Sequence, residues 1–180
     1  FFLVVTNKKD TNNLIKDGNK RVVEARLADA KFFWDKDKSK NLIKQIAKLK
    51  DVKFYEGLGS VYNKTQRLRK LSGMLADEFN LNKEKAEIAA SISKSDLCSD
   101  LVNEYPDLQG LLGKYFALSQ GFEEEVSNAV SDHYLPLGNN SMTSKKPISY
   151  SVAISDKIDT LIGFFLINEK PTSSKDPFAL

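Results

Sequence analysis

The sequence has few of the residues on which metal and disulfide chemistry depends. It contains one cysteine, Cys98, and one histidine, His133. A single cysteine excludes a disulfide within the chain and a zinc site made of thiolates, and it is typical of a reducing compartment. A site with several histidine ligands is excluded as well. We therefore expect a cytoplasmic protein with no bound metal and no catalytic residues of its own.

Long hydrophobic runs are also missing from the sequence. The longest apolar stretches, residues 1–5 and 161–167, are too short to cross a bilayer, and no charged segment precedes a cleavable apolar one. We expect no association with a membrane. The chain begins with Phe1 and not with methionine, from which we expect an internal segment of a longer protein.

Motifs that bind nucleotides or carry catalysis are absent too. The sequence has no Walker loop, dinucleotide fingerprint or nucleophile elbow, each of which requires a characteristic pattern of glycines. The run Ile92–Ser95 resembles the lysine-serine loop that class I aminoacyl-tRNA synthetases place over ATP. Because it continues an alanine-rich helical pattern, we expect Lys94 to lie on the surface of a helix.

One group of titratable residues leaves two interpretations open. His133 precedes Asp156 and Asp159, and the pattern places the histidine on one helix and the two acids on the next. Such a group can bind a metal or transfer a proton. It can equally consist of hydrogen-bonding side chains in a core or at a surface.

What the sequence does have is an ordinary globular composition and an uneven distribution of charge. Hydrophobic residues make up 41% and charged residues 28%, with a net charge of +3. Lysine and arginine outnumber acids between positions 31 and 70, whereas acids prevail between 81 and 141. A basic stretch can bind a phosphate backbone. The alternative is a solvated helix face.

Apolar periodicity predicts a mainly helical protein. Residues 1–6 are apolar and β-branched and predict a strand left over from a preceding domain. Gly18 is expected to break the chain before a helix from Asn19, with a buried stripe that includes Val22, Leu27 and Trp34. Further helices are predicted after the caps Ser39, Ser60 and Asn82, over 108–118 and 122–134, and over 152–167 with nearly complete burial. Asp176 with Pro177 is expected to open one more helix.

Blocks of sequence that occur in order along the chain are not explained by helix formation. They are Gly18–Val22 with Ala25–Asp37, Leu58–Ser60, Ser93–Gly110, Asp132–Pro136, and Ser155–Leu161 with Pro171–Leu180. Together they resemble the beta subunit of the bacterial two-subunit glycyl-tRNA synthetase, with the patterns GNERV, ARLxDAxFF, SKADL, EHYxP, ADKLDTL and PTGSKDPFAL. The departures are conservative in part, such as Tyr105 for phenylalanine, and include Lys20 for glutamate.

The resemblance implies a function for the whole enzyme. The enzyme would join glycine to its tRNA, tRNA(Gly), with ATP and magnesium bound by the alpha subunit and none in this segment. The implied partners are the alpha subunit, tRNA(Gly) and the remaining domains of the beta subunit. The segment is then expected to support tRNA binding and subunit architecture and not to contain the adenylation site.

The resemblance also implies a degenerate HD domain, a helical fold in which phosphohydrolases bind metal through histidines and aspartates. The first histidine falls among Lys64 to Arg67, the His-Asp pair falls near Lys94, and Asp156 matches the closing aspartate. His133 and Asp156 are thus remnants of the site, and an active metal phosphohydrolase is a weaker alternative. The basic residues at the replaced positions are candidates for tRNA contacts, namely Lys64, Arg67, Arg69 and Lys94.

The expected organisation follows from these comparisons of blocks and periodicity. Residues 1–17 are the tail of a preceding domain and 18–59 a helical connector. Residues 60–167 form the HD-like domain, and 168–180 begin the linker to the next domain. A purely architectural role, in which the segment docks other parts of the enzyme, remains the second alternative.

Overall fold

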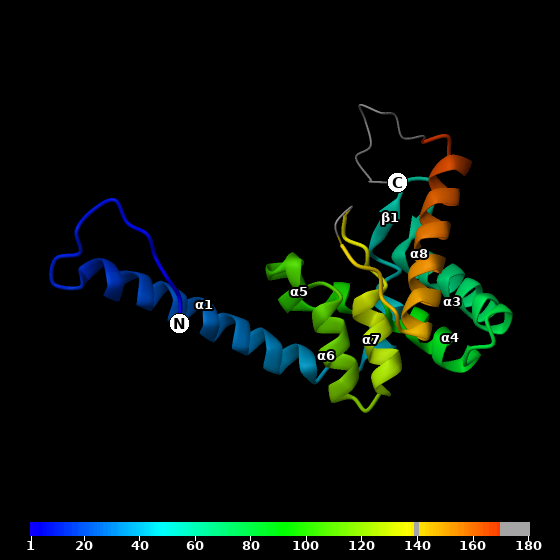
Figure 1. The fold of residues 1–180 in the computed structure, drawn as a ribbon, viewed down its shortest axis with the longest axis horizontal. Helices are drawn as coiled ribbons and strands as arrows, with labels where there is room; N and C mark the ends of the chain where they lie inside the picture. Colours follow the sequence, from blue (N-terminus) through cyan, green and yellow to red (C-terminus); the bar gives the residue numbers. More distant parts are fainter. Residues whose placement is uncertain (139–140, 170–180) are drawn as a thin grey trace.

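The computed structural model describes residues 1–138 and 141–169 of the chain. Figure 1 shows a compact group of helices, from which one long helix extends with its N-terminal half away from the rest. The elements are α1 (Leu14–Lys38), α2 (Leu42–Lys48), β1 (Lys53–Tyr55), β2 (Gly59–Ser60), α3 (Val61–Glu78), α4 (Lys83–Ile92), η1 (Ser95–Cys98), α5 (Asp100–Glu104), η2 (Pro106–Leu108), α6 (Leu111–Ser119), α7 (Glu124–Asp132) and α8 (Pro147–Leu166). The prediction of a mainly helical fold is confirmed.

The core lies between α3, α4, α6, α7 and α8. Leu68 of α3, Phe116 of α6 and Val152 of α8 are buried within it, together with small residues such as Ala89 and Ala90 of α4. Alanines at consecutive positions let α3 and α4 approach closely, and these two helices share the most extensive contact in the molecule. Burial of this shared apolar face is the main stabilising contribution to the helices.

A small hairpin precedes α3. β1 pairs with β2 in antiparallel fashion, with Lys53 opposite Ser60. Gly59 has a φ of +81°, and a side chain there would come within 2.9 Å of the amide oxygen of Asn63. Glycine is therefore required at this turn, because the left-handed backbone and the nearby cap leave no room for a Cβ. The sequence predicted a loop at this position.

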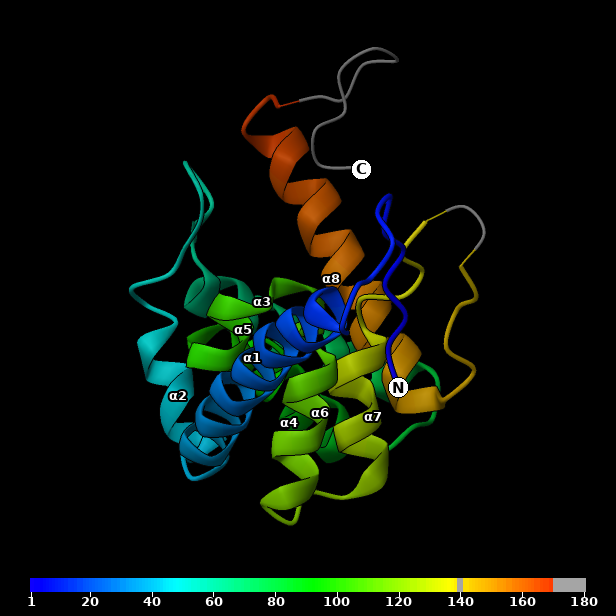
Figure 2. The same cartoon turned by 90° about the vertical axis from the view of Figure 1, so that its left-hand side faces the viewer.

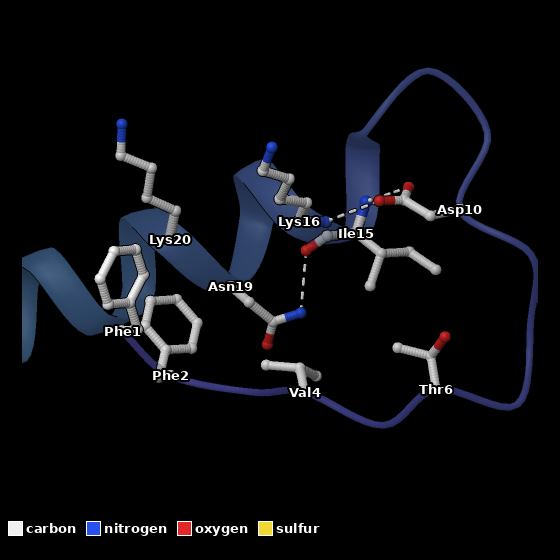
Figure 3. A pocket seen from close by; sticks show the side chains of 9 residues that line it. All are labelled: Phe1, Phe2, Val4, Thr6, Asp10, Ile15, Lys16, Asn19 and Lys20. Carbon is white, nitrogen blue, oxygen red and sulfur yellow. Dashed lines mark hydrogen bonds between the residues drawn. The ribbon is translucent and has the colours of Figure 1, made fainter.

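The N-terminal segment does not form the predicted strand. Residues 1–13 contain no strand, because no neighbouring strand is placed to complete the hydrogen bonds. Figure 3 shows this segment turning back along the first turns of α1, with Phe2 and Val4 facing Ile15 and Asn19 across an open pocket of about 350 Å³. The carboxylate of Asp10 accepts hydrogen bonds from the backbone amides of residues 15 and 16, at 2.9 and 3.1 Å.

The helix α1 differs from its prediction in two respects. It begins at Leu14, so Gly18 lies inside it and does not break it. Val22 and Leu27, predicted to be buried, are each 63% exposed, because the N-terminal half of α1 has no neighbouring helix. The C-terminal half is anchored: Trp34 stacks on Phe116 of α6, with ring centroids 5.2 Å apart. Figure 2 shows this half lying across α5 and α6.

The cap of the next helix was also predicted at the wrong residue. Asn41 caps α2, since its side-chain oxygen accepts a hydrogen bond from the amide of Lys44 at 3.1 Å, whereas Ser39 closes α1. The predictions of Ser60 and Asn82 as caps are confirmed. The predicted helix over 108–118 begins later, at Leu111, after the short turn η2.

The last helix, α8, is longer and less buried than predicted. It starts at Pro147, and its N-terminal half is buried through Ile148 and Val152. In its C-terminal half Leu161 is 44% and Ile162 53% exposed, so the expectation of nearly complete burial is wrong. The physical reason is that α8 extends past the helices that cover its first turns (Figure 1).

Two further expectations concern regions at the limits of the structure. The helix predicted at Asp176 lies outside the described residues. Among the described residues, no helix combines the length and apolar character needed to cross a membrane. The division into residues 1–17, 18–59, 60–167 and 168–180 stays a prediction.

Candidate functional site

A capped helix start places the first basic residues of the site. Ser60 and Asn63 form a reciprocal cap at the start of α3: the Ser60 hydroxyl accepts from the Asn63 amide, and the Asn63 side chain accepts from the Ser60 amide at 3.0 Å. The cap fixes the phase of the helix. Lys64 and Arg67, one turn apart, therefore face α8.

The centre of the site is a carboxylate held between two buried lysines. The Nζ atom of Lys64 lies 2.8 Å from Oδ1 of Asp156, and Nζ of Lys94 lies 2.8 Å from Oδ2 of the same residue. The side chains of Lys64 and Lys94 are 4% and 8% exposed, and that of Asp156 is 13% exposed. Burial alone raises the pKa of Asp156, but Lys94 and Lys64 outweigh it and hold that pKa well below its ordinary value.

Polar and aromatic neighbours complete the surroundings of the two ammonium groups. Lys64 also donates to the hydroxyl of Thr160 at 2.6 Å and lies 3.3 Å from the carboxylate of Asp159. Each ammonium faces an aromatic ring, Phe54 for Lys64 and Tyr134 for Lys94, at 4.5 and 4.0 Å from the ring centroids. The donors of both lysines are therefore engaged inside the protein.

Lys94 reaches the cluster because the chain turns inward at the end of α4. The helix ends at Ile92, and the turn η1 begins at Ser95, so Lys94 stands between them. The expectation that Lys94 is a lysine on a helix surface is wrong, since it is only 6% exposed. The turn is held from its other side by Asp96, whose Oδ2 accepts from the Gly110 amide at 2.6 Å.

The two arginine candidates lie nearer to solvent. Arg67 binds Asp159 through two nitrogens, with Nη2 at 3.1 Å from Oδ2, and its side chain is 40% exposed. Arg69 is 54% exposed and its Nε lies 3.0 Å from the carboxylate of Glu87. The structure thus brings Lys64, Lys94 and Arg67 together at α8 and leaves Arg69 apart on the α4 side of α3.

His133 lies at the end of α7 and is fully buried beside the cluster. Its Nδ1 atom is 2.9 Å from the carbonyl oxygen of Val130, which accepts only, so Nδ1 carries the proton. Its Nε2 atom lies 3.9 Å from Oδ2 of Asp156. Burial lowers the pKa of His133 to about 3, and the nearby Lys94 lowers it further. The imidazole is therefore neutral at physiological pH.

This arrangement decides between the chemical roles considered for the histidine and the acids. A metal ion at Asp156 would have to displace two lysine ammonium groups that already neutralise it. Within residues 1–138 and 141–169, no three histidine, cysteine or acidic side chains are grouped so as to hold a metal ion. A histidine with so low a pKa is also a poor proton carrier near neutral pH. The geometry favours a hydrogen-bonded, ion-paired core.

Asp159 and Thr160 are partners that the sequence did not assign to the lysines. One signal was available: Lys64 and Arg67 are three residues apart, and so are Asp156 and Asp159. Matched spacing on two helices permits matched ion pairs when the helices lie side by side, as α3 and α8 do. The contacts of Tyr134 with Lys94 and with the Gln109 amide depend on tertiary packing and left no such signal.

Comparison with known proteins agrees with this construction of the chain. The family described as glycyl-tRNA synthetase beta subunit matches residues 1–180. The chain belongs to that family. A glycine–tRNA ligase beta subunit of Phenylobacterium zucineum is 44% identical over 99% of this chain and 28% of the relative. Those of Rhodospirillum centenum and a Janthinobacterium species are 42% and 39% identical, each over 99% of this chain and 26% of the relative.

The extent of the match limits what it assigns. The chain spans about a quarter of the length of these curated relatives. Within this member of the glycyl-tRNA synthetase beta subunit family, the described cluster pairs every carboxylate with a cation. It offers neither an activated nucleophile nor a free base to a substrate, and its chemistry is that of a structural core.

Proposed function

We propose that this chain is a scaffold region of a glycine–tRNA ligase beta subunit that supports tRNA binding and does not carry the adenylation site. The enzyme as a whole would attach glycine to tRNA(Gly) with ATP, and the ATP and magnesium would be held by the alpha subunit. The proposal places the protein in the cytoplasm, with which the single free cysteine, Cys98, is consistent.

One observation carries the scaffold role, namely the closed cluster around Asp156. Two buried lysines from α3 and from the α4 to η1 junction meet on one carboxylate of α8. A buried ion cluster fixes the relative position of the helices that contribute to it, since any displacement separates desolvated charges. The helices around it then form a firm base for surfaces that bind other molecules.

The bases that remain accessible support the tRNA part of the proposal. Of the four candidate contacts, Arg67 and Arg69 are 40% and 54% exposed, whereas Lys64 and Lys94 would have to leave their carboxylate to reach a phosphate. Guanidinium groups bind phosphate through two hydrogen bonds. We therefore assign the contact with the tRNA backbone to the arginines and the scaffold role to the lysines.

The test compares the two sets in the complete alpha and beta enzyme. The double variant Arg67→Gln with Arg69→Gln should bind tRNA(Gly) more weakly, and the slope of log affinity against log salt should fall by about two, one for each phosphate contact. Lys94→Met, checked for native helicity, should leave the slope unchanged. Lys16→Gln with Lys20→Gln on α1 removes the same number of exposed cations elsewhere and serves as the matched control.

Each result decides between scaffold and binding surface. An unchanged slope in the arginine variant would leave architecture as the sole role. An equal decrease in the α1 control would show that the effect is general charge and not this face. Formation of glycyl-adenylate from glycine and ATP by this chain without the alpha subunit would overturn the proposal that adenylation occurs elsewhere.

A further inference from the structure

Three buried oxygen atoms on two neighbouring elements have no hydrogen-bond partner among the described residues. They are Oε1 of Gln45 in α2, and Oγ of Ser95 and Oδ1 of Asp96 in η1. The three residues are 7%, 1% and 0% exposed, respectively. Buried polar atoms are almost always hydrogen-bonded in native proteins, so three such atoms close together indicate a missing partner.

The same three residues line one small cavity. It has a volume of about 10 Å³, and Leu42 and Phe116 contribute to its apolar wall. This volume corresponds to the space that the centre of one water molecule needs. The cavity is therefore large enough for a single water and too small for an organic ligand.

We propose that this cavity binds one ordered water molecule that joins α2 to η1. The water donates one hydrogen bond to the amide oxygen of Gln45 and one to Oδ1 of Asp96. It accepts one from the hydroxyl of Ser95. Three hydrogen bonds are the typical number for a buried water, and this assignment satisfies all three unpartnered atoms at once.

The donor set argues for water and against a bound cation. Magnesium requires near-octahedral oxygen coordination and calcium six to eight oxygens, whereas this cavity offers three. Lys40 also lines the cavity, and its ammonium is 2.6 Å from Asp37, so a positive charge is already present beside the site. A neutral molecule that both donates and accepts fits this environment better.

The water would act on the position of the ion cluster. The turn η1 follows Lys94 directly, and Asp96 already ties the turn to Gly110 through its other oxygen. A water bound to Ser95 and Asp96 adds an attachment to α2, a helix of only seven residues. The site thus fixes the turn from which Lys94 reaches Asp156. The inference does not depend on the proposed function of the chain.

Hydrogen exchange in the full-length protein, followed by mass spectrometry of the peptides of α2 and η1, tests the proposal in solution. Gln45→Met keeps the volume and removes one acceptor of the water. With the water bound, the amides of α2 should exchange roughly fivefold faster, because one hydrogen bond is lost. Without it, the variant removes a buried acceptor that has no partner, and exchange should slow or stay unchanged.

Two further measurements keep the test decisive. Gln66→Met, at a half-buried glutamine of α3 outside the cavity, is the matched control and should leave α2 unchanged. Ser95→Ala should speed exchange in η1 and replaces the first variant if Gln45→Met does not fold. A high-resolution crystal structure should show one water in contact with all three oxygens. An empty cavity, or an anomalous peak in crystals grown with rubidium, would overturn the proposal.

Discussion

Lys64 and Lys94 differ from Lys44 and Lys48 in everything except their charge. The first two are buried on opposite oxygens of one carboxylate, whereas Lys44 and Lys48 lie exposed on α2 with no ion pair among the described residues. All but Lys94 belong to the same basic stretch of sequence. The difference shows that the availability of a cation depends on where the fold places carboxylates and not on the density of lysines along the chain.

The energetic reason for the difference is solvation. An exposed ammonium keeps its water and gains little from a partner, since solvent and salt screen the interaction. A buried ammonium has lost its water, so the carboxylate beside it is indispensable. The buried pair is therefore expected to respond strongly to substitution and the exposed bases hardly at all.

The largest effect is expected for Asp156→Asn. This substitution removes the charge shared by Lys64 and Lys94 and leaves two desolvated cations, with only Asp159 close to the first. The free energy of unfolding should fall by about 3–5 kcal/mol. Urea unfolding of the purified chain, followed by circular dichroism, measures this change.

A matched change at the surface provides the control. Asp29→Asn alters an exposed aspartate of α1 that has no ion pair, and it should leave the free energy of unfolding nearly unchanged. A loss of less than about 1 kcal/mol in Asp156→Asn would mean that the cluster is solvated and behaves like a surface pair.

Lys94→Met should have a smaller effect, because Asp156 keeps Lys64 as its partner. The expected loss is about 1.5–3 kcal/mol, the value of a hydrogen bond to a charged group. The double variant Asp156→Asn with Lys94→Met removes one charge of each sign. It should be more stable than Asp156→Asn alone, and strictly additive losses would contradict the coupling of the two residues.

The pH dependence of stability sharpens the comparison through His133. Its pKa is about 3 in the folded chain because of burial, against an ordinary value of about 6.5 in the unfolded chain. As pH falls, the unfolded state binds the proton first, so the stability contribution is complete above pH 6.5 and is lost progressively towards pH 3. At pH 5 the loss should be on the order of 2 kcal/mol.

The variant His133→Asn isolates this contribution. Asp96 acts in the opposite direction, since burial raises its pKa and the folded state then gains a proton as pH falls. Asp156 contributes only below about pH 4, because its folded pKa is lowered. The measured quantity is thus the difference between the parent chain and His133→Asn from pH 7 to 5. Parallel curves would show that the imidazole is not buried as described.

The smallest effect is expected at the exposed pair of Lys31 and Asp35. These residues are one turn apart on α1, with side chains 74% and 58% exposed. Lys31→Ala should change the free energy of unfolding by no more than about 0.5 kcal/mol, and added salt should abolish the difference. A larger effect in urea unfolding would contradict the distinction between buried and exposed cations.

Residues that act locally were predicted well. Ser60 and Asn82 were identified as caps because a cap involves a few consecutive residues, and the helices near the predicted positions of the core followed from their apolar spacing. The candidate bases were named correctly as a group near Asp156. Their burial was not, because the sequence contains no direct information on which helix covers which face.

The sequence by itself determined the mainly helical fold, the family and the positions of the ion-pairing residues. These properties depend on local periodicity, capping and ordered motifs, all of which are present in the linear chain. Only the tertiary structure decided that residues 1–6 form no strand, that α8 is partly exposed and that Lys94 points inward. Each of these depends on contacts between segments far apart in sequence, and those contacts decide whether a strand finds a partner or a charge loses its water.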